Sequence, residues 1–140
     1  MTQEERDLLI KDLSARLPYG VKAYVRNWSK IDRRYYEGVY IVDTACPSLN
    51  TVLVTSDKGS VEVIVGYDDY EIKPYLFPLS SMSEEQKNVH DTLVFNINFI
   101  ESGRKTVVRM LFEFYFKNHI DYNGLIEKGL ANDATGLNIY

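Results

Sequence analysis

The stretch E-I-K-P-Y-L-F-P-L-S-S-M-S-E-E-Q, from Glu71 to Gln86, divides the sequence into two halves of different character. Before it, short runs alternate between apolar and polar residues, as in strands; after it, the pattern is mainly helical. Pro74 and Pro78 fix the backbone φ angle and remove two amide donors, so neither a helix nor a central strand is expected to pass through them. Ser83 and Gln86 have the spacing of a capping box, which predicts that a new helix begins there.

The composition is that of a single soluble domain, residues 1–140, in which residues 1–76 form a helix-plus-strand half and residues 77–140 a mainly helical half. With 45% hydrophobic and 26% charged residues, the chain can bury a core without disulfides or metals. No apolar run approaches the roughly 20 residues that span a bilayer, and the acidic N-terminus does not resemble a signal peptide. The single cysteine, Cys46, fits a reducing cytoplasm. A net charge of −4 disfavours broad binding to nucleic acid.

The N-terminal half begins with a helix predicted from Gln3 to Arg16. Thr2 and Glu5 have capping-box spacing, leucines recur at helical intervals, and Pro18 with Gly20 would end the helix. Its charged side chains, expected on a solvated face, are Arg6, Lys11, Arg16, Glu4, Asp7 and Asp12.

Alternating patterns then predict five short antiparallel strands. They are Val21 to Asn27, Tyr35 to Ala45, Asn50 to Ser56, Ser60 to Gly66 and Tyr70 to Tyr75. Gly38 is expected to mark a bulge or bend. By analogy with other folds of this strand number, we expect an α+β fold whose strands form a small bent barrel of the SH3 or Sm kind, with a C-terminal helical layer.

The second half is expected to contain a helix from Ser83 to about Thr92. Residues 94–100 fit two patterns: apolar residues alternate with Asn96 and Asn98 as in a strand, which we favour, but they also fit a continuing helix. A strongly apolar helix is predicted from Arg104 to Asn118, and one that apolar should be buried on more than one side. Tyr122 to Ala131 is predicted as a short helix, followed by an extended tail.

Three stretches, taken in their order and spacing, resemble one family. They are K-D-L-S-A-R-L-P-Y-G-V-K at Lys11–Lys22, I-K-P-Y-L-F-P-L-S-S-M-S-E-E at Ile72–Glu85 and D-Y-N-G-L-I-E-K-G-L-A at Asp121–Ala131. The family is a set of small uncharacterised proteins from genomes of gut Bacteroidetes, often encoded in prophages or mobile elements. Ser14 and Asn123 depart from its pattern, where Cys and Arg are common. The resemblance implies a bacterial or phage cytoplasmic setting, and it carries over no catalytic or binding residue.

Chemical motifs are sparse in this sequence. The Gly124 and Gly129 spacing lacks the lysine of a phosphate-binding loop, and two histidines with one cysteine are few ligands for a metal. His119 is expected to bond the last carbonyls of the preceding helix, and Asp121 to cap the next one. No nucleophile–base pair or metal set can be assembled, so we expect no cofactor and consider an enzyme the least favoured class.

Basic and aromatic residues gather between Val21 and Tyr40, where five basic residues outnumber two acidic ones. Basic groups interleaved with aromatic rings are typical of surfaces that bind single-stranded nucleic acid or a peptide. The alternative is a solvated connection between strands, with the tryptophan in the core. The candidate binding residues are Lys22, Arg26, Trp28, Lys30, Arg33, Arg34, Tyr35 and Tyr36.

These patterns favour a non-enzymatic protein-interaction module over a nucleic-acid-binding small barrel that would use the Val21–Tyr40 face. The partner is expected to be a protein or a second copy of the chain, with no membrane contact; a small-molecule ligand stays unknown. Self-association is assigned to the apolar helix, at Phe112, Tyr115 and Phe116. The alternative is that the tail, residues 132–140, covers these rings in a monomer.

Overall fold

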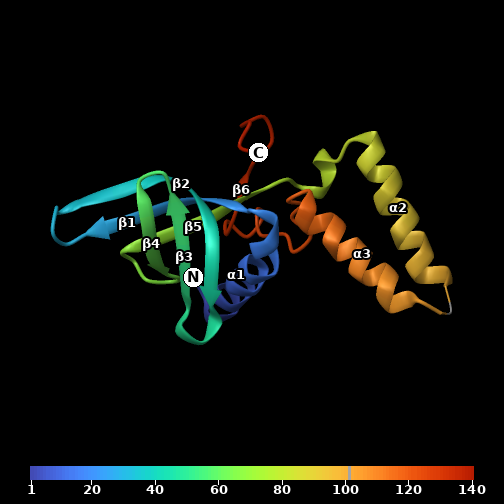
Figure 1. Cartoon of the computed structure of the whole chain (residues 1–140), viewed down its shortest axis with the longest axis horizontal. Helices are drawn as coiled ribbons and strands as arrows, with labels where there is room; N and C mark the ends of the chain where they lie inside the picture. Colours follow the sequence, from blue (N-terminus) through green and yellow to red (C-terminus); the bar gives the residue numbers. More distant parts are fainter. Residues whose placement is uncertain (101) are drawn as a thin grey trace.

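A computed structural model describes residues 1–100 and 102–140 as an α+β fold with an N-terminal helix, a six-stranded mixed sheet and a helical hairpin (Figure 1). The helices and strands, in chain order, are α1 (Gln3–Arg16), β1 (Lys22–Ser29), β2 (Arg34–Cys46), β3 (Thr51–Ser56), β4 (Gly59–Ile64), β5 (Tyr70–Leu76), α2 (Glu84–Phe99), α3 (Arg104–Lys117) and β6 (Asn132–Asp133). Short 3-10 turns occupy Leu17–Tyr19, Pro47–Leu49 and Leu79–Ser81.

Helix α1 has the bounds that its capping pattern predicts. The Thr2 hydroxyl accepts a hydrogen bond from the Glu5 amide at 3.1 Å, and the Glu5 carboxylate accepts one from the Thr2 amide at 2.7 Å. These two bonds satisfy amide groups that an uncapped helix would leave without partners. Gly20, with a φ of 66°, turns the chain into β1 through the left-handed conformation that glycine adopts at low cost.

The sheet is open, and the SH3- or Sm-like barrel is not confirmed. Its strand order is β4-β3-β2-β1-β5-β6, with all neighbours antiparallel except β5 and β6. The edge strands β4 and β6 do not pair with each other among the described residues, so the sheet does not close. Gly38 pairs in regular register with Val25, and the irregularity of β2 lies instead between Val42 and Thr44.

Helix α1 covers one face of the sheet and forms the core with it. Leu9 and Leu13 are fully buried on the helix, and the C-terminal segment adds Leu125 to the same core. The buried sheet residues that pack against them are Val21, Ala23, Val25, Tyr40, Val42, Val52, Val54, Val63, Ile72 and Leu76. Since α1 occupies this face, the opposite face of β5, β1 and β2 is left for solvent or a partner.

The second half differs from expectation at two places. Residues 94–99 continue α2 and are not a strand, because their apolar side chains also fit the helical period that began at Ser83. Residues 122–131 form turns and not a helix, since Gly124 and Gly129 both adopt positive φ angles. Helix α3 is confirmed from Arg104 to Lys117. No helix in the described part of the chain is both long and apolar enough to cross a membrane.

Candidate interaction surfaces

The hairpin of α2 and α3 projects from the body of the molecule (Figure 1). Gln86 Nε2 donates to Asn118 Oδ1 at 3.3 Å, and His90 Nε2 lies 2.9 Å from the Tyr115 hydroxyl, so the start of α2 lies beside the end of α3. We call this end of the hairpin the base and the opposite end the tip. Among the described residues of the two helices, only Leu93 is buried. The prediction that α3 is buried on several sides is therefore wrong.

A groove of about 710 Å³ lies between the helices on one side of the hairpin, and Tyr19, from the turn after α1, also lines it. Its lining on α2 and α3, which we call the groove face, consists of Val89, Leu93, Met110 and Phe114, bordered by Glu85, Glu113 and Lys117. Met110 is 47% exposed within it. At the tip, Phe95 and Phe99 are more than half exposed, with their ring centroids 4.5 Å apart. Exposed apolar side chains grouped in this way often mark interaction surfaces.

The three residues assigned to self-association lie away from this groove. The Tyr115 ring stacks on Tyr122, with centroids 5.2 Å apart, and Phe112 meets the same tyrosine edge-on at 5.4 Å. The Phe116 ring lies 5.9 Å from Tyr19. Tyr115 and Phe116 are half-buried, and only Phe112 is exposed. These rings join α3 to Tyr19 and Tyr122, and none of the three residues lines the groove.

A buried ion pair within α1 also bonds to the segment after α3. Arg16 Nε lies 2.6 Å from an Asp12 carboxylate oxygen, with both side chains fully buried, and Arg16 Nη2 donates to the Ile120 carbonyl at 2.7 Å. Asn123 donates to the same aspartate at 3.0 Å. The expectation that Asp12 and Arg16 lie on a solvated face is wrong, because Ile120 and Asn123, more than 100 residues away in the sequence, bond to the pair in the folded chain.

His119 does not cap α3 through its ring, as expected from its position. The ring stacks on Tyr140, with centroids 3.6 Å apart and planes inclined by 10°, and its Nδ1 is buried without a partner among the described residues. The last carbonyls of α3 bond instead to the Asn118 side chain and to backbone amides. Burial, with Arg16 and Lys22 nearby, lowers the pKa of His119 to about 4.

The three sequence stretches quoted above for the resemblance meet around Ile120. The Phe77 amide donates to the His119 carbonyl at 2.8 Å, and the Asp121 amide donates to the Phe77 carbonyl at 2.9 Å. Arg16, from the first stretch, bonds the Ile120 carbonyl between them. Asp121 does cap backbone amides, those of Leu125 and Ile126, but they belong to a turn and not to a helix. The convergence forms the structural joint between the sheet and the hairpin.

The predicted basic–aromatic residues divide between the two sides of the β1–β2 hairpin. Arg26, Trp28 and Tyr35 share the sheet face opposite α1: the Arg26 guanidinium lies 4.2 Å from the Tyr35 ring centroid, and Trp28 meets that ring edge-on at 4.9 Å. Lys22 projects on the same face, but its ammonium donates to the Ile139 carbonyl at 2.7 Å. Lys30 and Arg33 lie in the turn, where Arg33 has a positive φ.

Arg34 and Tyr36 lie on the other side of that hairpin, where the Arg34 guanidinium lies 4.6 Å from the Tyr36 ring centroid. The Tyr36 hydroxyl also bonds Asp32. On the face that carries Arg26 and Tyr35, the Tyr24 hydroxyl donates to Glu37 at 2.7 Å, and this bond raises the Tyr24 pKa to about 12. Acidic groups therefore accompany the basic residues on both sides, which reduces the positive field that nucleic acid would need.

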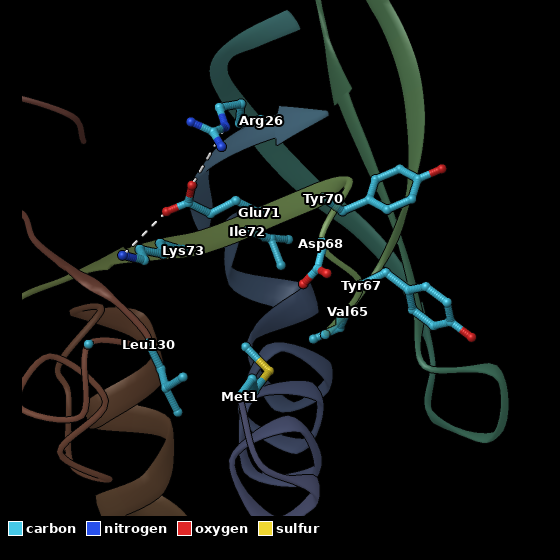
Figure 2. A pocket seen from close by; sticks show the side chains of 12 residues that line it. Met1, Arg26, Val65, Tyr67, Asp68, Tyr70, Glu71, Ile72, Lys73 and Leu130 are labelled. Carbon is cyan, nitrogen blue, oxygen red and sulfur yellow. Dashed lines mark ion pairs between the residues drawn. The ribbon is translucent and has the colours of Figure 1, made fainter. Parts of the chain in front are cut away.

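Figure 2 shows a cavity of about 270 Å³ beside β5. Glu71 lies between two cations there, 3.8 Å from Arg26 Nε and 3.3 Å from Lys73 Nζ. Asp68 also lines the cavity, so its two basic side chains are balanced by two carboxylates. Ion pairs this exposed contribute little free energy, and nothing in their arrangement selects a charged ligand.

Neither a metal cluster nor a known relative identifies a site. Within residues 1–100 and 102–140, no group of three His, Cys, Asp or Glu side chains could hold a metal ion. Comparisons with protein-family models, with curated proteins and with solved structures found no match. The geometry of the chain itself is therefore the basis for a functional proposal.

Sequence reasoning missed the groove face and the tip phenylalanines. Phe95 and Phe99 fall in the segment that we expected to be a strand, which concealed their place at the end of a long helix. The helical spacing of Val89, Leu93 and Ile97 was the signal that could have found them.

Proposed function

We propose that this chain is a non-enzymatic protein-interaction module whose contact surface is the groove face of the α2–α3 hairpin. The observation that carries the proposal is the apolar groove between two helices that the sheet leaves uncovered. Grooves of this kind are typical docking surfaces for helices of partner proteins. The partner is a protein or a second copy of the chain. The family resemblance supports a bacterial or phage setting, in a mobile element and in the cytoplasm.

Site-specific photo-crosslinking tests this assignment. A photoreactive phenylalanine replaces Met110 in the groove or, as a control, Val39 on the open sheet face; the two side chains have exposed fractions of 47% and 45%. We expect discrete protein adducts after irradiation of cells that express the Met110 variant, and few from the Val39 variant. Adducts at Val39 alone would move the contact surface to the sheet, and no adduct at either position would reject the proposal.

A nucleic-acid-binding function is the second candidate, favoured by the shared face of Arg26, Trp28 and Tyr35. An aromatic pair beside a guanidinium is a combination on which bases can stack. Glu37 and Glu71 oppose it, since they lie on the same face and bond to its residues. Retention on heparin or single-stranded DNA that falls as salt rises would favour this candidate over the first.

A further inference from the structure

We infer that the partner on the groove face is a second copy of this chain, with the two hairpins packed antiparallel about a two-fold axis so that the base of one lies beside the tip of the other. The inference rests on the proposed function and names its partner. It is carried by the placement of charge along the hairpin, with an excess of basic residues at the tip and of acidic residues at the base.

Arg109 and Glu113 lie on α3, two residues before and two residues after Leu111. Leu111 is near the middle of α3, which runs from Arg104 to Lys117. A two-fold axis at the level of Leu111, perpendicular to the helix, exchanges these two levels. Each Arg109 then reaches the level of Glu113 in the other copy, and the contact occurs twice.

Both side chains are exposed enough to make this contact. Arg109 Nε lies 3.9 Å from Glu113 Oε1 within the chain, and the two side chains are 71% and 55% exposed. An exposed pair at that distance contributes little, so exchanging it for a contact between chains costs little. The apolar lining beside it, Met110 and Phe114, would lose its contact with water at the same time.

The charges at the two ends of the hairpin favour the antiparallel over the parallel arrangement. The tip half of α3 carries three basic residues, Arg104, Lys105 and Arg109, and no acidic one; Glu101, in the connection, adds one acidic residue by sequence. At the base, the first half of α2 carries Glu84, Glu85 and Asp91 against one lysine, and the end of α3 adds one charge of each sign, so the base keeps an acidic excess. Tip-to-tip pairing would bring like charges together, whereas base-to-tip pairing brings each basic tip to the level of an acidic base.

The size of the surface predicts a weak dimer. A helix of 14 residues is about 21 Å long, and two helices side by side are about 20 Å wide, which gives roughly 400 Å² per copy. Stable complexes commonly bury about 800 Å² per partner, so we expect dissociation in the micromolar range. Measurements must therefore cover protein concentrations from about 1 to 500 µM.

Sedimentation equilibrium of paired charge-reversal variants tests the inference. We expect the wild type to dimerise, and Arg109→Glu and Glu113→Arg each to weaken self-association at least tenfold, because each homodimer would then contain two like-charge contacts. An equimolar mixture of the two variants should dimerise again, since both contacts become opposite in charge. Lys58→Glu, in the β3–β4 turn, is the control and should not change the dissociation constant.

Two results would overturn the inference: a wild type that stays near 16 kDa across the whole range, or weakened variants that do not recover on mixing. If the wild type is monomeric while Met110 still forms adducts with other proteins, the groove serves a different partner and the interaction module stands. If Met110 forms no adduct and the wild type is monomeric, both proposals fail.

Discussion

The His119 ring lies flat against the Tyr140 ring, with centroids 3.6 Å apart, although 21 positions separate them in the sequence. The Tyr140 hydroxyl donates to the Tyr75 carbonyl at 2.8 Å and accepts from the Lys22 amide at 3.0 Å. The last residue of the chain therefore holds together β1, β5 and the segment after α3. The tail closes the joint below the hairpin and leaves the groove face open.

The buried ring of His119 makes stability depend on pH. Its pKa is lowered from 6.5 to about 4, so the unfolded chain binds a proton more readily than the folded one between these values. The free energy of unfolding should fall as pH decreases from about 6.5 to about 4, and this contribution should be constant above 6.5. Denaturant titrations at several pH values, with His119→Asn as the variant that lacks the group, check this. An NMR signal assigned to His119 that titrates near 6.5 would contradict it.

Removing the Tyr140 ring should affect the histidine directly. In Tyr140→Leu, the lost stack and hydroxyl bonds should cost about 1–2 kcal/mol of stability. The His119 pKa should rise toward its ordinary value, because water then reaches the ring. NMR titration of the variant measures the pKa, and an unchanged value would mean that Tyr140 does not shield the histidine.

The Asp12–Arg16 pair should show strong non-additivity. Asp12→Asn or Arg16→Met leaves one buried charge without its partner, and each should cost about 3–5 kcal/mol. The double variant Asp12→Asn/Arg16→Met removes both charges and should cost less than the sum of the single changes. Chemical denaturation of all four proteins completes the cycle. Additive losses would show that the two side chains do not interact.

The nucleic-acid candidate makes its own prediction. If the Val21–Tyr40 face binds single-stranded DNA, reversing the charges of Arg26, Arg33 and Arg34 should abolish gel shifts that the wild type gives at low salt. Because Glu71 forms an ion pair with Arg26 and Asp32 accepts a hydrogen bond from Tyr36, we expect no wild-type shift. A clear shift that these substitutions remove would favour the second candidate.

Local signals in the sequence predicted local structure well. The capping residues of α1 and α2, the five strands up to Leu76 and the long apolar helix α3 all follow from short-range patterns, and the structure confirms them. Barrel closure was not predictable from strand count, because it depends on how edge strands far apart in sequence meet. The segment 94–99 was misassigned because its asparagines made two periods fit equally.

Long-range contacts explain what sequence reasoning could not find. The burial of Asp12 and Arg16 depends on Ile120 and Asn123, which no pattern within α1 announces. The exposure of α3 depends on its position in a hairpin that projects from the sheet. The sequence of a strongly apolar helix predicts burial, and only its neighbours in the fold show otherwise. The three predicted contact residues on α3 pack against Tyr19 and Tyr122, and only Phe112 among them is exposed.

The arrangement of two copies can be measured by paramagnetic relaxation. One copy carries a spin label at the tip, introduced as Lys105→Cys with Cys46→Ser, and contains no isotope label. It is mixed with isotopically labelled wild type. The account predicts that amide signals of the isotopically labelled copy broaden most at the base of its hairpin, at Glu84–Lys87, and least at its tip. Broadening that is strongest at the tip or on the β1–β2 face, or no broadening at several hundred micromolar, would contradict it.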